Sequence, residues 1–482
     1  MNTLNKLSPG PMDRARHSSN PSMDNTPLPL PRRDLLCKAV LHYVTTDAVP
    51  IGMKRQPLEE KANSHLENFS LKNFINQKGM DLDERTKAFK EFTSHLEGEG
   101  LILYRRQVKG ATKRQVTIHD PLTGGEKEML MFGSNNYLSL AAHPHVVNSV
   151  KNYIDQYGIG AGGPPLLNGT TELHVQVEKK LAQFKGLDDT ILFSSGFLAQ
   201  LGWMTALIDK EDMVFFDEYS HASFFEGLKL TKCKKLPFRH NDLEGLEKKL
   251  DKYKHTGKTC WICVEGVYSM DGDLAPLNEV IEIAKRHNCR VAVDDAHGTG
   301  VIGEGKGTAH HFNIDPADID IHFGTFSKAF GTSGGFVCAK QDLINYMRFM
   351  SRAHMFSAAL PAPVVASVMA GLEVMEREKE LFSNLSESVE YLLKKLDELG
   401  IAAESESAII PILIPEGVNI RKMALEFHQQ GIFVNSVEFP AVPLDKQRFR
   451  ISMMATHTEE DIDQLVSVIK DLFIKYNIIT VQ

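Results

Sequence analysis

Short apolar runs alternate with amphipathic stretches in the central part of this chain, from about residue 150 to residue 360. The stretches between the runs, such as Asn278 to Asn288, have the length of a helix. Strands that alternate with helices form parallel sheets, because each crossover helix covers one face of the sheet. The sequence therefore predicts an α/β fold with a mostly parallel sheet and helices on both faces. The predicted strands are Thr190–Phe193, Met213–Phe216, Thr259–Val264, Arg290–Val293, Ile319–Phe323 and Gly335–Ala339.

The segment from Thr171 to Phe184 has the periodicity of a helix that packs by one face. Its apolar residues recur at intervals of three or four, which places them on the same side of a helix. Polar and charged residues take the other side. The apolar positions are Leu173, Val177, Leu181 and Phe184, and the polar ones are Glu172, Gln176, Lys179 and Lys180.

Composition divides the chain into four predicted parts. Residues 1–65 are rich in Pro, Ser, Asn and charge, so we expect a disordered or loosely packed extension, in which Leu35 to Val44 could form a docking helix. Residues 66–145 lead into the core through a helical pattern and a polar hairpin. Residues 146–370 form the predicted large domain, and residues 371–482 form a smaller α+β domain. The predicted elements outside the large domain are a helix at Leu71–Leu103, a hairpin ending at Met129–Phe132, helices at Val374–Leu399, near Arg421–Gln430 and from Glu459, and strands at Ile409–Ile414, Ile432–Val437 and Phe449–Met453.

Charge and hydropathy exclude several classes of function. The net charge of -8 and the pI near 6.2 leave no basic face for a nucleic acid. No apolar run approaches the ~20 residues of a membrane span, and the N-terminus lacks the pattern of a signal peptide. We therefore expect a cytoplasmic protein with no nucleic-acid partner and no transmembrane segment.

Two pairs of residues suggest redox or metal chemistry but have plainer explanations. Cys260 and Cys263 lie within an apolar run that is predicted to be a buried strand, so core packing in a reducing compartment accounts for them. His310 and His311 lack a spaced partner and are expected to be a loop pair rather than metal ligands. No metal is therefore expected.

Residues that suit a cofactor follow several of the predicted strands. Ligands bind beyond the carboxyl ends of the strands in an open α/β sheet. Ser194, Ser195 and Gly196 precede a helix, where free N–H groups suit a phosphate, although Ser194 could equally be a helix cap alone. After the next strands, His221 could stack on a flat aromatic ring and Ser269 could donate a hydrogen bond to a ligand.

Asp294 closes the strand that begins at Arg290. An acid at the end of a buried strand is costly unless it is paired or hydrogen-bonded. A protonated pyridine nitrogen would be a suitable partner, and the pair would keep the ring cationic as an electron sink. The alternative is a metal site built on Asp294 and Asp295 with His297, for which the sequence offers no obvious further ligand.

Lys328 stands among apolar and neutral residues, in the segment from Ile321 to Gly331. A partly desolvated amine is available as a nucleophile and forms Schiff bases with carbonyl groups, including the aldehyde of pyridoxal phosphate (PLP). The alternative is an ordinary strand-end lysine that points toward water. Thr325 and Ser327 add hydroxyl donors beside it. A phosphate-binding turn at Ser194–Gly196, a histidine that can stack on a ring, a carboxylate and a lysine follow successive strands of one sheet. This order favours the cofactor site.

That order resembles the fold-type I PLP enzymes, and in detail the α-oxoamine synthase family, over roughly residues 90–475. The family includes 8-amino-7-oxononanoate synthase, serine palmitoyltransferase, 5-aminolevulinate synthase and 2-amino-3-ketobutyrate CoA ligase. Many motifs in one order make the resemblance specific. The motifs that carry it are Ser134–Leu140, Asn168–Thr170, Ser195–Phe197, His221–Ser223, Ser269–Asp273, Asp294–Gly298, Thr325–Lys328 and Arg450–Ile451.

The resemblance implies a fold, a cofactor and a set of site residues. The expected fold is a large domain with a seven-stranded sheet and a smaller C-terminal α+β domain, and the expected assembly is a homodimer with shared active sites. Lys328, His221, Asp294 and His297 are implied as catalytic residues. Lys328 would bind PLP covalently, His221 would stack on the ring, and Asp294 would pair with the ring nitrogen, while His297 and Ser269 would lie near the ring hydroxyl. The phosphate would be contacted by Gly196, Phe197 and Thr325, and by Ser357 from the neighbouring subunit, and Ser195 and Ser327 would complete the cofactor set. The carboxylate of the amino acid would be bound by Arg450, with Asn135 nearby.

The implied reaction is a decarboxylative condensation of serine, glycine or alanine with an acyl thioester of CoA or an acyl carrier protein, giving a 2-amino ketone. Relatives often carry Ser-Arg or Thr-Arg where this chain has Pro164 and Pro165, and two prolines remove polar donors and stiffen the loop. A fatty acyl chain is therefore expected rather than a carboxylated one such as succinyl. A 2-amino-3-ketobutyrate CoA ligase remains an alternative, and so does a non-catalytic partner subunit. The N-terminal extension could guide a carrier protein or be a tail.

Overall fold

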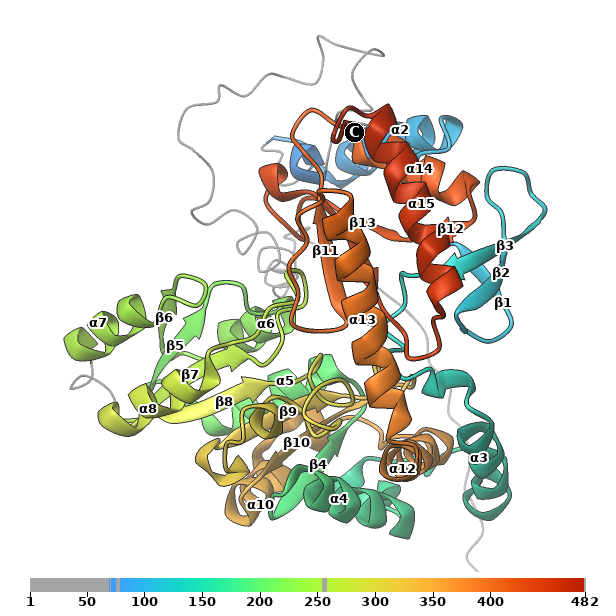
Figure 1. Cartoon of the computed structure of the whole chain (residues 1–482). Coiled ribbons are helices and arrows are strands. Elements are labelled where there is room, and N and C mark those ends of the chain that lie inside the picture. Colours follow the sequence, from blue (N-terminus) through green and yellow to red (C-terminus); the bar gives the residue numbers. More distant parts are fainter. Residues whose placement is uncertain (1–68, 70, 75–78, 254–257, 481–482) are drawn as a thin grey trace, which may run out of the picture.

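The computed structural model describes residues 69, 71–74, 79–253 and 258–480. The predicted extension of residues 1–65, with its docking helix at Leu35–Val44, lies outside these residues. Within the described ranges, no helix combines the length and the apolar character that a membrane crossing requires. Figure 1 shows a larger part built around one sheet, and a smaller part in which the C-terminal elements lie beside the N-terminal hairpin.

A seven-stranded sheet forms the centre of the larger part, with the strand order β4-β10-β9-β8-β7-β5-β6. The neighbours from β9 to β6 are parallel, while β10 runs antiparallel to both β4 and β9. The predicted mostly parallel, seven-stranded sheet is therefore confirmed. The strands are β4 (Asp189–Phe193), β5 (Met213–Asp217), β6 (Lys234–Phe238), β7 (Cys260–Glu265), β8 (Arg290–Asp294), β9 (Ile321–Thr325) and β10 (Gly335–Ala339).

The edge strand β6 is the one member of this sheet that the sequence pattern did not predict. Its residues read Lys-Lys-Leu-Pro-Phe, and only Phe238 is buried. Pro237 lacks a backbone donor, which an edge position tolerates because one side of the strand needs no partner. The strand forms because β5 offers it a parallel neighbour on one side.

Helices cover both faces of the sheet, as predicted. The predicted helix at Thr171–Phe184 is confirmed as α4, and its four apolar residues are buried. Cys260 and Cys263 are buried within β7, as core packing requires, and the described cysteines are free thiols. One face carries α5 (Gly196–Leu207), α6 (Ala222–Leu230) and α10 (Gln341–Met350), and the other carries α4 (Glu172–Lys185), α7 (Leu243–Tyr253), α8 (Leu277–His287) and α12 (Ala362–Arg377) with α3 (Pro144–Tyr157) against it.

Two short helices lie in the loops of the larger part. They are α9 (Thr308–His311) and α11 (Arg352–Met355). His310 and His311 form the end of α9, so the predicted loop pair is in fact helical. His310 lies 3.9 Å from a carboxylate oxygen of Glu304, which makes a surface ion pair when the ring is protonated.

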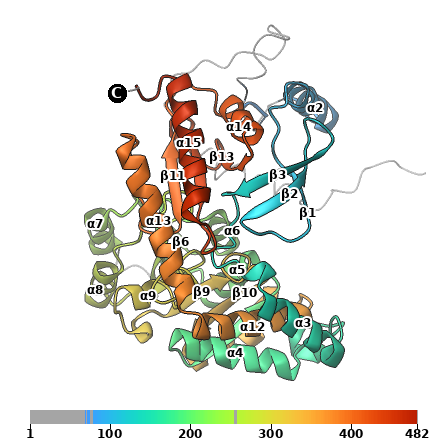
Figure 2. The same cartoon turned by 45° about the vertical axis from the view of Figure 1, so that its right-hand side comes forward.

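The predicted helix at Val374–Leu399 is two helices, so that prediction is wrong. α12 ends at Arg377, and α13 (Glu380–Glu398) begins after Glu378 and Lys379. α12 is buried along most of its length in the larger part, whereas α13 packs by one stripe against α15 (Glu459–Lys475). Figure 2 shows α13 leaving the end of α12 and rising toward α15. Both helices contribute to one hydrophobic core, and the chain bends here because α12 packs against α3 and α4 whereas α13 packs against α15.

The smaller part contains two sheets rather than one. One is an antiparallel sheet of β11 (Ile409–Leu413), β14 (Arg448–Ser452) and β13 (Asn435–Val437). The helix α14 (Ile420–Gln429) follows β11 along the chain. The predicted single strand at Ile432–Val437 is wrong. Its first half is β12 (Ile432–Phe433), which pairs in parallel with β3, and Val434 marks the change of sheet.

The N-terminal segment also departs from its prediction. The helical pattern at Leu71–Leu103 gives a single 3₁₀ turn at Leu71–Phe74 and a helix α2 (Leu82–Gly98). A capping box fixes the start of α2, because Asp81 accepts from the Glu84 N–H and the Glu84 carboxylate accepts from the Asp81 N–H. The predicted hairpin is confirmed as β1 (Gln107–Lys109), β2 (Gln115–His119) and β3 (Glu126–Met131).

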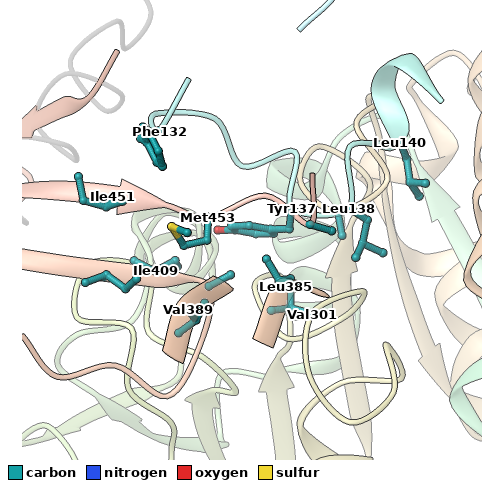
Figure 3. Packing of buried hydrophobic residues seen from close by; sticks show 14 of the residues in the cluster. Phe132, Tyr137, Leu138, Leu140, Val301, Leu385, Val389, Ile409, Ile451 and Met453 are labelled. Carbon is teal, nitrogen blue, oxygen red and sulfur yellow. The ribbon is translucent and has the colours of Figure 1, made fainter. Parts of the chain in front are cut away.

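A hydrophobic core joins the larger and smaller parts, and it supports the segment from Phe132 to Leu140. Figure 3 shows Tyr137 among residues of both parts, with Val301 on one side and Ile409 and Ile451 on the other. Tyr137 is fully buried, and only its hydroxyl oxygen is polar. This core therefore fixes the distance between the sheet and β14, which borders the site below. The limits proposed for the four parts remain predictions.

Candidate active site

The carboxyl ends of β7, β8 and β9 bring the predicted catalytic residues to one edge of the sheet. Asp294 is the last residue of β8, and it pairs in register with Glu265 of β7 and Phe323 of β9. Lys328 follows β9 by three residues. The order of the strands therefore places the acid and the amine on adjacent segments, as the sequence predicted.

Lys328 and Asp294 perturb each other and are both withdrawn from bulk water. Burial lowers the pKa of Lys328 to about 8, against the opposing attraction of Asp294 and Glu265. Burial raises the pKa of Asp294 to about 6, although the charge of Lys328 and the Ala296 N–H act the other way. About a tenth of the Lys328 amine is consequently neutral at pH 7, far more than for an ordinary lysine, and a nucleophile or a general base needs that neutral form.

His221 forms the N-cap of α6, so the helix fixes its ring. Its Nδ1 atom accepts from the Ser223 N–H at 3.2 Å and pairs with the Ser223 hydroxyl at 2.8 Å. His221 is exposed as a residue, yet desolvation by the surrounding protein, Lys328 and Arg450 lower its pKa to about 4. A neutral and accessible imidazole suits stacking on an aromatic ring.

Arg450 of β14 links the smaller part to the site. Its Nε–H donates to the Ser269 carbonyl at 2.7 Å, and its Nη1–H donates to the Asn135 side-chain oxygen at 3.1 Å. The Tyr137 hydroxyl lies 3.5 Å from Nη2 of the same guanidinium and 2.7 Å from Nδ1 of His297. Asn135, Ser269, His297 and Arg450 are therefore brought together as predicted.

The cradle at the start of α5 is built for close approach. Ser195, rather than Ser194, caps the helix, because its hydroxyl accepts from the Leu198 N–H at 3.1 Å. A Cβ on Gly196 would lie 2.7 Å from the Thr325 hydroxyl, so only glycine fits there. Thr325 in turn donates to the Gly334 carbonyl and lies 2.9 Å from the Ser327 hydroxyl. Phe197 beside this cradle is 46% exposed.

Within a single chain, Ser357 is not part of this cluster. It follows α11 and lines a separate cavity of about 440 Å³, together with Ser194 and Leu166. Its predicted contact with a phosphate across a subunit interface stays a prediction.

The structure gives Asp295 a different role from the metal ligand considered above. Its Oδ2 atom accepts from Lys185 Nζ at 2.7 Å, and both side chains are about 2 % exposed. Its Oδ1 atom accepts from the Thr308 hydroxyl. Asp295 thus fixes the loop after β8 through its contacts with Lys185 and Thr308. Among the described residues, no group of three His, Cys, Asp or Glu side chains is arranged to hold a metal ion.

Two residues of the site were not among those predicted from the sequence. Glu265 ends β7 as Asp294 ends β8, but the glycines after it suggest a turn. Tyr137 belongs to the Ser134–Leu140 motif, yet its apolar neighbours conceal the hydroxyl that contacts His297. The position of Glu265 at the end of a buried strand was the available signal.

The donor set fits PLP. A lysine with a lowered pKa, a half-buried carboxylate, a neutral imidazole and a glycine cradle at a helix N-terminus are the groups that its aldehyde, ring nitrogen, ring face and phosphate require.

Comparisons with known proteins agree with this chemistry. Residues 127–469 match the aminotransferase class I and II family. The chain is 35% identical to the 8-amino-7-oxononanoate synthase of Thermoanaerobacter pseudethanolicus, over 77% of this chain and 95% of that protein. It is 36% identical to the serine palmitoyltransferase of Sphingobacterium spiritivorum, over 81% of this chain and 96% of that protein.

A further relative is longer than this chain. The chain is 36% identical to 4-hydroxy-2,2'-bipyrrole-5-methanol synthase PigH of a Serratia strain, over 83% of this chain but only 61% of that protein. Among solved structures, the serine palmitoyltransferase of Sphingomonas wittichii superposes with a TM-score of 0.78 at 29% identity, covering 83% of this chain and all of that one. A serine palmitoyltransferase structure that contains PLP gives a TM-score of 0.77 at 30% identity, with the same coverage. The chain belongs to the α-oxoamine synthase family of PLP-dependent acyltransferases.

Proposed function

We propose that this chain condenses a small amino acid with a fatty acyl thioester, with loss of CO₂, to give a 2-amino ketone. One observation carries the proposal. Lys328 and Asp294 stand at the carboxyl edge of the sheet, and Arg450 with Asn135 faces them from the smaller part. An amine, an acid and a carboxylate-binding guanidinium are the groups that a PLP-dependent reaction of an amino acid needs.

The residues that would hold the cofactor follow from the site. Lys328 would bind its aldehyde, Asp294 its ring nitrogen and His221 its ring face. When bound, PLP supplies a cationic ring that stores the charge of a carbanion. The Ser195–Phe197 turn with Thr325 and Ser327 would hold the phosphate, His297 and Ser269 would face the ring hydroxyl, and Ser357 of a second subunit would complete the phosphate site.

Arg450 would orient the amino acid by its carboxylate. The Ser269 carbonyl and the Asn135 amide oxygen fix the guanidinium, and a third donor edge lies toward Tyr137. Arginine suits this task because it binds a carboxylate in a bidentate manner. Lys328, with its pKa of about 8, would then remove the α-proton as a general base and hold it on Nζ.

We infer that the acyl chain binds beside an apolar surface. The π-helical turn from Pro165 to Gly169 has two prolines at its start, and Leu167 at its centre is 80% exposed. A proline has no N–H to offer a second carboxylate, so this surface suits an alkyl chain. We therefore favour a fatty acyl thioester over a short or carboxylated one.

We further propose a cytoplasmic homodimer. Phe349, Met350 and Phe356 are more than half exposed on and after α10, close to the segment that carries Ser357. Exposed apolar residues in one region are a common mark of a subunit interface. The free thiols among the described cysteines fit a reducing compartment.

Absorbance and mass spectrometry test the cofactor. The purified protein should show the visible band of enzyme-bound PLP, and borohydride reduction should fix one PLP to Lys328. Lys328→Ala should lose the covalent attachment. A colourless protein that takes up no PLP would overturn the proposal.

Substrate choice requires a second experiment. Glycine, serine, alanine and threonine are titrated against the cofactor spectrum, and acyl thioesters of increasing length are then added while CO₂ release is measured. Release only with acetyl-CoA and glycine would favour the ligase alternative. Amino-acid binding without CO₂ release, for any thioester of CoA or an acyl carrier protein, would favour a non-catalytic subunit.

A further inference from the structure

Glu265 is a second carboxyl group directly beside Asp294. The two residues are paired in register at the ends of the adjacent parallel strands β7 and β8, so both side chains project to the same face of the sheet. Glu265 is only 3% exposed. Both residues line one small cavity of about 10 Å³ beneath the site, together with His221 and Gln200.

The Glu265 carboxyl group ties together two loops of the site. Its Oε2 atom accepts from the Ser269 N–H at 3.3 Å, and the backbone N–H of His221 approaches the same group. Ser269 in turn receives the Arg450 guanidinium on its carbonyl. The Glu265 side chain thus connects the loop after β5, which carries His221, with the loop after β7, which carries Ser269.

The other oxygen of Glu265 has no hydrogen-bond partner among the described residues. The side-chain oxygen of Gln200 lines the same cavity and also lacks one. An ionised carboxylate in this position would leave a charged acceptor buried and unsatisfied, which is costly. A protonated carboxyl group is neutral and avoids the cost of the buried charge.

The charges around the pair lead to the same conclusion. Asp294 faces Glu265 from β8, Lys328 faces it from the segment after β9, and His221 adjoins it before α6. His221 is neutral near pH 7, because its pKa is about 4. Two carboxyl groups therefore face one lysine. Burial and the Asp294 charge raise the pKa of Glu265 well above its ordinary value, whereas Asp294, with a pKa of about 6, ionises first.

We propose that Glu265 is a positioning residue that stays protonated beside the Asp294 carboxylate and holds the His221 and Ser269 loops, so that Asp294 alone carries the negative charge toward the cofactor ring. The inference rests on the proposed PLP-dependent function. A second ionised carboxylate would compete for Lys328 and for the ring nitrogen. A neutral acid gives the same hydrogen bonds without that competition.

Two substitutions separate charge from shape. Glu265→Gln has the shape of the protonated acid and keeps an oxygen that accepts from the Ser269 N–H. Glu265→Ala removes the link between the loops. Glu279→Gln, at an exposed position on α8, is the matched control. Three properties are measured: the Kd for PLP of the apo protein, the pH midpoint of the visible band of the loaded protein, and the melting temperature.

Glu265→Gln should leave the Kd and the pH midpoint as in wild type and in the control. Glu265→Ala should raise the Kd for PLP by about tenfold or more. A shift of about one pH unit or more in Glu265→Gln would show that Glu265 carries charge and would overturn the proposal. A wild-type Kd in Glu265→Ala would also overturn it.

Infrared difference spectroscopy of the apo protein detects the protonation state of the Glu265 carboxyl group directly. The carbonyl stretch of a protonated carboxyl group should be present at neutral pH in wild type and weaker in Glu265→Gln, where the contribution of Glu178, with a pKa of about 7, remains. This measurement needs no PLP and no folded alanine variant, and a band of equal intensity in wild type and Glu265→Gln would contradict the neutral state of Glu265. Failure of wild type to bind PLP would instead overturn the proposed function, so the two failures are distinct.

Discussion

The Tyr137 hydroxyl lies 2.7 Å from Nδ1 of His297 and 3.5 Å from Nη2 of Arg450. His297 belongs to the loop after β8, and Arg450 belongs to β14 of the smaller part. Tyr137 comes from neither, and the core in Figure 3 fixes its ring. The three residues connect the proposed cofactor side of the site with its carboxylate side.

Tyr137→Phe should lower turnover by about tenfold and destabilise the fold by about 1–3 kcal/mol, because a buried polar contact of His297 is left unsatisfied. Steady-state kinetics and urea denaturation measure the two effects. Tyr157→Phe on α3, where the ring is half-buried and remote from the site, should change neither. Equal losses in both variants would show that the Tyr137 hydroxyl has no special role.

Lys185→Met should destabilise the protein by about 3–5 kcal/mol, because it leaves Asp295 buried without its cation. Lys185→Met combined with Asp295→Asn should recover part of the loss, since no lone charge remains. Denaturant unfolding of both variants checks this. The exposed pair of Lys248 and Glu244 provides the control, and Lys248→Met should have no measurable effect. Additive losses in the double variant would argue against the ion pair.

His240 should make stability depend on pH. Its ring bridges Asp217 and Asp273, and these hydrogen bonds and charges raise its pKa to about 10, although burial acts the other way. Because the folded pKa lies above the ordinary value of 6.5, this stabilisation is fully present below pH 6.5 and is lost as pH rises toward 10.

His240→Gln is the variant that tests this dependence. The difference in unfolding free energy between wild type and His240→Gln should shrink steadily between pH 6.5 and pH 10, as measured by denaturation at several pH values. A difference that stays constant over this window would rule out the raised pKa.

Gly196→Ala should weaken PLP binding by about tenfold or more, because the added Cβ would lie 2.7 Å from the Thr325 hydroxyl and displace the cradle. Equilibrium dialysis with PLP gives the Kd. Gly98→Ala, at the end of α2 with no atom within 4 Å of the added carbon, is the control. Unchanged affinity in Gly196→Ala would show that the cradle does not hold the phosphate.

Much of the fold follows from local pattern. The run at Cys260–Val264 is apolar and buried in every position, as expected of a strand covered on both faces, so the sequence reveals it. The edge strand β6 has no such requirement, because only one residue of it is buried. The break between α12 and α13 is hidden for a related reason. Neither Pro nor Gly marks it, and it arises because α12 packs against α3 and α4 whereas α13 packs against α15 within the same hydrophobic core.

By itself, the sequence determined the α/β sheet, the family and the cluster of Lys328, Asp294, His221 and Arg450, because these depend on apolar runs and on residues that follow strand ends. Only the tertiary structure decided how Glu265 faces Asp294 and how Asp295 turns away to Lys185. Strand register and the alternation of side chains across a sheet set these pairs, and neither can be read from one segment alone. The charge of each carboxyl group depends on such neighbours, so the chemistry of the site became visible only with the fold.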